Sequence, residues 1–154
     1  MTAVESEVTI SEWIGQDANG GAAPDDSLAN SESQQVRRQW QAVIDKLLEW
    51  LTSPEPIEYE ELEPLSCDLL QTAIDFALDA QSAATSLPSA FGPSVDGGIS
   101  FEWRFGDGSL MHMEVVDIGL TEITLMRAGQ VLDHYWLERI PQHRGWLKRD
   151  RPAA

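Results

Sequence analysis

The chain has 154 residues, of which 42% are hydrophobic and six are tryptophan, and this length and composition suit one folded domain with additional tail segments. Its 26 acidic and 10 basic residues give a net charge of −16, and so acidic a surface repels nucleic-acid phosphates while it attracts cationic proteins. No apolar run approaches the roughly 18 residues of a membrane span, and no secretory signal pattern opens the chain. The lone Cys67 can form neither an internal disulfide nor a cysteine-based zinc site. We therefore expect a cytoplasmic protein without membrane or nucleic-acid partners.

The negative charge is concentrated in the first half of the chain. Residues 1–80 hold 17 acidic and 3 basic residues, a net of −14, whereas residues 81–154 hold 9 acidic and 7 basic residues, a net of −2. Either this acidity maintains solubility alone, or it recruits a basic protein partner. The sequence leaves both interpretations open.

Residues 1–30 are predicted to form a mostly disordered acidic arm, because the stretch "GQDANGGAAPDDSLANSES" has little apolar surface to bury. The arm contains one apolar island, in which Ile10, Trp13 and Ile14 would share one face of a helical turn. This island is either docked on its own domain or a linear binding motif. As a binding motif, it would anchor a partner through Trp13 and Ile14.

Two helices are predicted to follow the arm. The first runs through "SQQVRRQWQAVIDKLLEWL" with an apolar stripe along one side, is capped by Ser31 or Ser33, and ends before Pro54. The second runs from about Ser66 to about Thr85, so the two can pair as a hairpin. The segment between them, "PEPIEYEELEP", is predicted to be an extended acidic linker. Its glutamates are either simply solvated or part of an acidic docking strip, and they are Glu58, Glu60, Glu61 and Glu63.

In the second half of the chain, apolar and polar residues alternate with the period of a strand. A three-residue loop over residues 106–108 is predicted between the first two strands, because it pairs Trp103 with Met111 and keeps the apolar face continuous. The same register sets Glu102 opposite His112 on the other face. A Glu–His pair is a candidate for acid–base chemistry, and it is also the ordinary filling of a polar sheet face.

Two further strands are predicted in "EITLMR" and "QVLDHYWL", and the register of their hairpin stays open. A two-residue turn would bury Leu132, His134 and Trp136, whereas a bulged turn would bury Val131 and Tyr135 instead. The predicted fold is therefore α+β, with a helical hairpin followed by a four-stranded antiparallel meander and the helices on one face. It occupies residues 31–141 as a single domain, and residues 142–154 form a basic tail.

The run "PSAFGPSVDGGISFEW" resembles a sheet-start signature of small bacterial proteins that have no established activity. The resemblance covers about the second half of the chain, and the acidic first half lies outside it. It implies a bacterial origin and a role for the glycines where the sheet begins, and it carries over no catalytic residue. The matching positions are Pro88, Pro93, Asp96, Gly97, Gly98, Ile99, Glu102 and Trp103.

No catalytic or cofactor-binding motif stands out. The stretch "GDGS" lacks the lysine of a phosphate-binding loop, no two histidines have metal-ligand spacing, and Cys67 has no obvious histidine partner. We therefore expect no cofactor and no metal, and we predict a non-enzymatic acidic module that binds a basic protein, such as a toxin or effector that it restrains. The alternatives are a small enzyme that uses the Glu102–His112 face and a structural subunit of a larger assembly. The sequence does not determine the oligomeric state.

Overall fold

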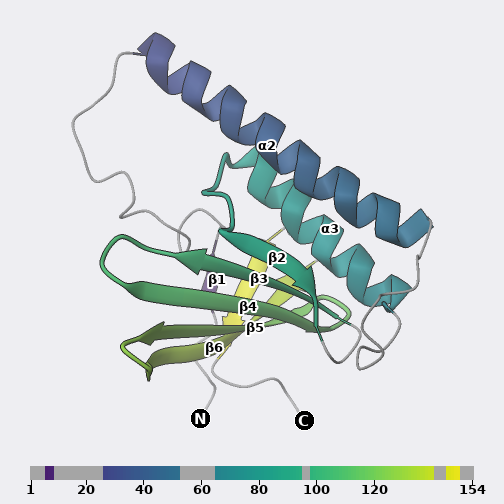
Figure 1. Cartoon of the computed structure of the whole chain (residues 1–154). Helices are drawn as coiled ribbons and strands as arrows, with labels where there is room; N and C mark the ends of the chain where they lie inside the picture. The colour runs from purple at the N-terminus through teal and green to yellow at the C-terminus, as the bar shows by residue number, and fades with distance from the viewer. Residues whose placement is uncertain (1–5, 9–25, 53–64, 95–97, 141–144, 150–154) are drawn as a thin grey trace.

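A computed structural model describes residues 6–8, 26–52, 65–94, 98–140 and 145–149. Within these ranges the chain forms two helices, α2 (Asp26–Thr52) and α3 (Cys67–Ser82), and an antiparallel sheet in the order β1-β7-β6-β5-β4-β3-β2 (Figure 1). The strands are β1 (Ser6–Val8), β2 (Ala90–Pro93), β3 (Ile99–Arg104), β4 (Ser109–Asp117), β5 (Leu120–Arg127), β6 (Gln130–Ile140) and β7 (Gly145–Arg149).

The α+β class is confirmed, and the four predicted strands form an antiparallel meander, β3 to β6, but the predicted total of four strands is wrong. The described sheet has seven strands, because β2 precedes the meander and β1 and β7 extend it on the far side. β1 lies in the segment assigned to the arm and β7 in the segment assigned to the basic tail, so the predicted boundaries at residues 31 and 141 do not match the ends of the sheet. The first helix likewise begins at Asp26 rather than at residue 31.

The two helices form two successive layers over the sheet rather than lying side by side on it. α3 lies directly on β3 and β4, and α2 packs along the outer side of α3 (Figure 1). Trp40 of α2 lies 6.1 Å from the ring of Phe76 on α3, and its indole N–H donates to the Thr85 carbonyl at 2.6 Å. α2 also reaches the sheet at β2, where the rings of Trp50 and Phe91 are 5.9 Å apart.

The core lies between α3 and one face of the sheet, which we call the inner face. Phe76 stands at its centre, with ring centroids 5.3 Å from Phe101 and 6.1 Å from both Trp103 and Trp146. Burying aromatic side chains of this size supplies much of the hydrophobic stabilisation of a small domain. The buried apolar strand residues of this face are Ile99, Phe101, Trp103, Met111, Met113, Val115, Ile123, Tyr135, Leu137 and Trp146.

The β3–β4 hairpin has the predicted three-residue loop. Trp103 lies opposite Met111, and Glu102 lies opposite His112. The Phe105 N–H donates to the Ser109 carbonyl at 3.0 Å, and Gly108 takes the left-handed conformation with φ 87° that closes the loop. Continuity of the apolar face therefore decided the register correctly.

The β5–β6 hairpin combines the two predicted alternatives. Its turn has two residues, Ala128 and Gly129, yet the register shifts between Leu125 and Met126 of β5, which places a bulge in β6. The extra residue moves each later side chain of β6 to the opposite face of the sheet from the one that an uninterrupted ladder would give it. Tyr135 is therefore buried, as in the bulged alternative. Val131, which that alternative also buried, is instead 60% exposed because it precedes the bulge.

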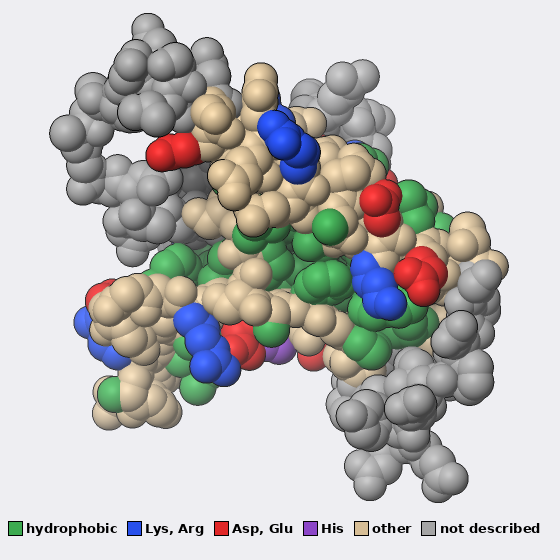
Figure 2. All heavy atoms as spheres, turned by 45° about the horizontal axis from the view of Figure 1, so that its top comes forward, with side chains coloured by type: hydrophobic (Ala, Val, Ile, Leu, Met, Phe, Trp, Pro, Cys, Tyr) green, Lys and Arg blue, Asp and Glu red, His purple; other side chains and the backbone are tan. Residues whose placement is uncertain are grey.

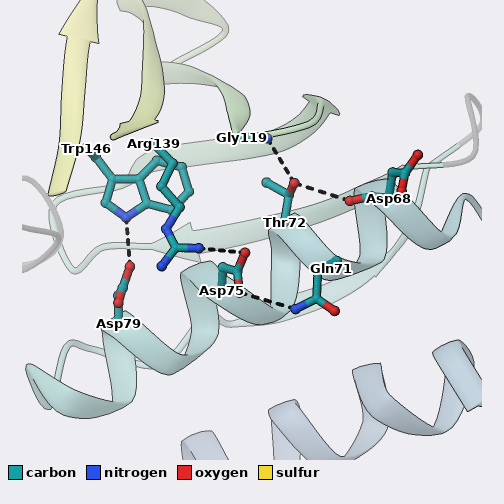
Figure 3. A network of polar contacts seen from close by, with 8 residues as sticks. All are labelled: Asp68, Gln71, Thr72, Asp75, Asp79, Gly119, Arg139 and Trp146. Carbon is teal, nitrogen blue, oxygen red and sulfur yellow. Dashed lines mark hydrogen bonds and ion pairs between the residues drawn. The ribbon is translucent and has the colours of Figure 1, made fainter. Parts of the chain in front are cut away.

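A polar network ties α3 to the C-terminal strands (Figure 3). The Asp75 carboxylate pairs with Arg139 of β6 at 2.6 Å, and Asp79 accepts a hydrogen bond from the Trp146 indole of β7 at 3.1 Å. Thr72 accepts from the backbone N–H of Gly119, in the β4–β5 turn, at 2.9 Å. Burial raises the pKa of the Asp79 carboxyl, and the Trp146 hydrogen bond and the Arg139 charge offset this effect only in part.

Candidate functional site

The candidate site is the outer face of the sheet, opposite α3, which no described helix or strand covers (Figure 1). Along each strand the residues between the buried ones point to this face, because successive side chains alternate. We call it the open face. The cross-strand pairs arrange its residues in four rows, which are Arg104-Leu110-Met126-Val131, Glu102-His112-Thr124-His134, Ser100-Glu114-Glu122-Trp136-Arg149 and Leu120-Glu138-Leu147-Glu7.

The two middle rows carry a concentration of glutamates. Glu114 of β4 lies directly opposite Glu122 of β5. Glu122 contacts the His134 imidazole at 3.4 Å, and Glu102 contacts the Arg104 guanidinium at 2.9 Å. By the register of the described strands, five glutamates stand in the four rows against two arginines, Arg104 and Arg149.

Large apolar side chains flank the glutamates at both ends of the open face. Leu110 and Met126 stand in the first row, and Leu120 and Leu147 stand in the last. The solvated face of an antiparallel sheet is ordinarily polar, so large apolar side chains at both of its ends are unusual. Apolar groups bordered by charged ones are typical of surfaces that bind another macromolecule.

The Glu102–His112 pair is present as a geometric pair on the open face. The Glu102 carboxylate accepts a hydrogen bond from Arg104 Nε, and the Arg104 side chain is 75% exposed. An exposed ion pair of this kind is what a solvated sheet face ordinarily carries. The catalytic roles of Glu102 and His112 remain a prediction.

The predicted binding residues of the arm and the acidic linker lie outside the described residues, and their roles stay predictions. They are Trp13, Ile14, Glu58, Glu60, Glu61 and Glu63. Within the described ranges, no three His, Cys, Asp or Glu side chains are placed so that they could hold a metal ion. The described helices include none with the length and apolarity to cross a membrane.

The turn beside the open face carries a carboxylate that is firmly anionic. Asp107 accepts hydrogen bonds from the hydroxyl and the backbone N–H of Ser109, and the Arg127 guanidinium lies 2.7 Å from it. These contacts lower the pKa of Asp107 to about 2. Asp107 is therefore ionised at neutral pH, and its negative charge is paired with the positive charge of Arg127.

The chain matches no protein-family model, no curated protein and no solved structure. Function has to be inferred from the open face itself.

Proposed function

We propose that this protein is a non-enzymatic acidic module that binds a basic protein through the open face of its sheet. The observation that carries the proposal is the direct opposition of Glu114 and Glu122 on a face that no described element covers. A toxin or effector whose activity is restrained by the complex is the partner that this chemistry suits.

Like charges placed directly opposite each other destabilise a sheet, by roughly 0.2–1 kcal/mol. Solubility does not require this arrangement, because glutamates at staggered positions would solubilise the face equally well. A cationic partner offsets the repulsion, because its charge would lie between the two carboxylates. The opposition thus presents two adjacent carboxylates to a cationic partner.

The helix side of the molecule carries charges of both signs. Figure 2, which views the molecule from the side of the helices, shows Lys and Arg side chains beside Asp and Glu, with hydrophobic side chains gathered between the helices and the sheet. Both helices are also net acidic, so charge alone attracts a basic partner to either side of the molecule. The apolar side chains at the ends of the open face are what favour contact there.

A second copy of this chain is a poor partner for the open face. Each copy has a net charge of −16, and the open faces of two copies would bring glutamates against glutamates. The glutamates predicted in the linker, Glu58, Glu60, Glu61 and Glu63, are proposed to add to the attraction of a basic partner at long range.

The test uses the protein that co-purifies with the full chain from its native cell. We expect association to be fast at low salt and to slow markedly as salt rises, because screening limits exposed charges to about 8 Å near physiological ionic strength. Glu114→Gln and Glu122→Gln should each lower the association rate and raise the stability of the free protein by about 0.2–1 kcal/mol. The matched control is Glu49→Gln on α2, where the exposed carboxylate contacts Lys46 at 3.7 Å and the association rate should stay unchanged.

The double variant separates repulsion from a general effect of charge. Once one of the two carboxylates is neutral, the direct repulsion is gone, so the second substitution should add little stability. Association that ignores salt and both substitutions would show that the acidity serves solubility alone.

A further inference from the structure

We infer that the basic partner is anchored at one end of the open face, on an apolar patch that the β5–β6 hairpin completes. The patch consists of Leu110, Met126, Val131 and Leu132, and we call it the hairpin patch. The inference rests on the proposed function and adds the place and chemistry of contact. An apolar side chain of the partner covers the hairpin patch, while cationic side chains beside it reach the glutamates of the middle rows.

The register of the sheet brings the hairpin patch together. Leu110 lies opposite Met126, and Met126 lies opposite Val131, so the three residues stand in one row across β4, β5 and β6. Leu132 follows Val131 at the bulge. Val131 is 60% exposed and Leu132 is 49% exposed. Single exposed apolar residues are common on protein surfaces, whereas contiguous ones mark interaction sites.

The bulge is what exposes Leu132. After a two-residue turn, an uninterrupted ladder would set Leu132 opposite Leu125, on the inner face. The bulge sets Asp133 opposite Leu125 instead, and Leu132 is left beside Val131. β6 thus exposes two adjacent aliphatic side chains at the end of the open face and still buries Tyr135 and Leu137 in the core.

The spacing between the hairpin patch and the glutamates defines the partner. Along β5, Glu122 is four residues from Met126, and Glu102 lies in the row two residues from Met126 but two strands away, on β3. At a rise of about 3.3 Å per residue and a strand spacing of about 4.8 Å, these backbone distances are roughly 13 and 12 Å. An extended segment with an apolar residue about four positions from a Lys or Arg matches the hairpin patch and Glu122 at once.

Charge complementarity selects a basic protein over the other occupants of an apolar patch. A second copy would bring its own net charge of −16. An anionic membrane surface would be repelled by the glutamates beside the patch. Buried apolar contact governs the dissociation rate of a complex and exposed charge governs the association rate, so the two features of the face have separate kinetic effects.

The experiment is site-specific photo-crosslinking in the native cell with the full chain. A benzoylphenylalanine replaces Val131 in one variant and Leu48 in the control, since Leu48 is 39% exposed on α2, on the opposite side of the molecule. We expect an adduct with a basic protein from position 131 and none from position 48. An adduct from position 48 alone overturns both the inference and the proposed function, because both place the partner on the open face. No adduct from position 131, with an association rate that Glu122→Gln still lowers, overturns the inference and leaves the proposed function standing.

Kinetics with the crosslinked protein, once it is purified, complete the test. The double variant Val131→Ser with Leu132→Ser should raise the dissociation rate about tenfold or more and leave the association rate and the thermal midpoint nearly unchanged. The control Leu78→Ser, at a side chain that is 43% exposed on α3, should change neither rate. An adduct with the mass of two copies of this chain, or an unchanged dissociation rate in the double variant, would overturn the inference.

Discussion

Trp103 and Glu102 are neighbours in β3 whose side chains lie on opposite faces of the sheet. Trp103 is 2% exposed, contacts Phe76, and donates its indole N–H to the Ser86 carbonyl at 3.0 Å. We expect Trp103→Ala to reduce the free energy of unfolding by about 3–5 kcal/mol, as aromatic truncations in cores do. Glu102→Ala should cost less than about 1 kcal/mol, because its ion pair with Arg104 is largely exposed. Urea denaturation of both variants measures the difference, and the reverse order would mean that the register of β3 is off by one residue.

Asp79 is a carboxylate that weakens the native state at neutral pH. Its pKa is raised by burial, so the native state binds the proton more tightly than the unfolded state does. The protonated Asp79 carboxyl therefore makes its full contribution to the free energy of unfolding below the unfolded pKa, near 3.8. That contribution is lost as the pH rises through the higher folded pKa. We expect Asp79→Asn to raise the free energy of unfolding at pH 7, because the amide oxygen still accepts from Trp146 and carries no charge.

The pH dependence and a matched carboxylate test this interpretation. The gain from Asp79→Asn should shrink as the pH falls and vanish near pH 3, as urea midpoints measured from pH 3 to pH 7 would show. Asp75→Asn, one helical turn earlier, should instead lower stability by about 1–2 kcal/mol at pH 7, because Asp75 makes a 2.6 Å contact with Arg139. If Asp79→Asn also destabilises the protein at pH 7, the charge on Asp79 contributes to the fold.

At the level of the elements, the β5–β6 turn contains an alanine in the left-handed conformation, which alanine disfavours. Ala128 has φ 52° and Gly129 has φ 77°, as in the two-residue turns that match the twist of a hairpin. Asparagine adopts this conformation more readily than alanine does. We expect Ala128→Asn to raise the free energy of unfolding by about 0.5–1 kcal/mol, as measured by thermal or urea denaturation.

Gly129→Ala provides the control for the turn. A Cβ at Gly129 would meet no atom within 4 Å, so the substitution changes backbone conformation without creating a clash. It should lower stability by about 1 kcal/mol. If both substitutions changed the free energy of unfolding in the same direction and by the same amount, the turn would have to relax to another conformation when it is substituted.

The two hairpins also show how far the sequence predicts this fold. The β3–β4 register follows from local pattern, because only one loop length keeps Trp103 opposite Met111. The β5–β6 register depends on a bulge, which resolves a conflict between the favoured two-residue turn and the burial of Tyr135. No local rule decides such a conflict, because the outcome depends on how Tyr135 packs within the core.

The strands at the far side of the sheet were missed for a different reason. β1 and β7 are three and five residues long, and their pairing joins the two ends of the chain. Contacts over such a sequence separation leave no periodic signal. Trp146 gave the one hint, since a tryptophan in a basic tail needs a place to be buried, and it fills the core beside Phe76.

The candidate site was predictable only in part. The facing of Glu102 and His112 follows from the predicted loop, and so does the position of Arg104 beside Leu110. The opposition of Glu114 and Glu122 requires the register of β4 and β5, which contains an irregularity between Val115 and Asp117. The sequence carries no signal for that irregularity, so the charge arrangement that supports the proposed function becomes visible only in the folded sheet.

At the scale of the whole molecule, the net charge of −16 makes the compact state repel itself. Attractive ion pairs between described residues are few beside this excess, with Arg139–Asp75 the most shielded of those described. Screening by salt therefore weakens the repulsion among the acidic residues more than it weakens the attractive ion pairs. We expect sodium chloride, raised from about 20 mM to about 500 mM, to increase the free energy of unfolding by an amount on the order of 1 kcal/mol.

The open face should account for part of that increase. The double variant Glu114→Gln with Glu122→Gln already lacks the direct repulsion between β4 and β5, so its stability should rise less with salt than that of the natural chain. Sodium chloride is the suitable salt, because sulfate would stabilise any protein through exclusion from its surface. Urea midpoints of both proteins at each salt concentration measure the effect. If salt instead lowers the stability of the natural chain, attractive ion pairs dominate its electrostatics, and the glutamates of the open face then carry no cost that a basic partner would have to offset.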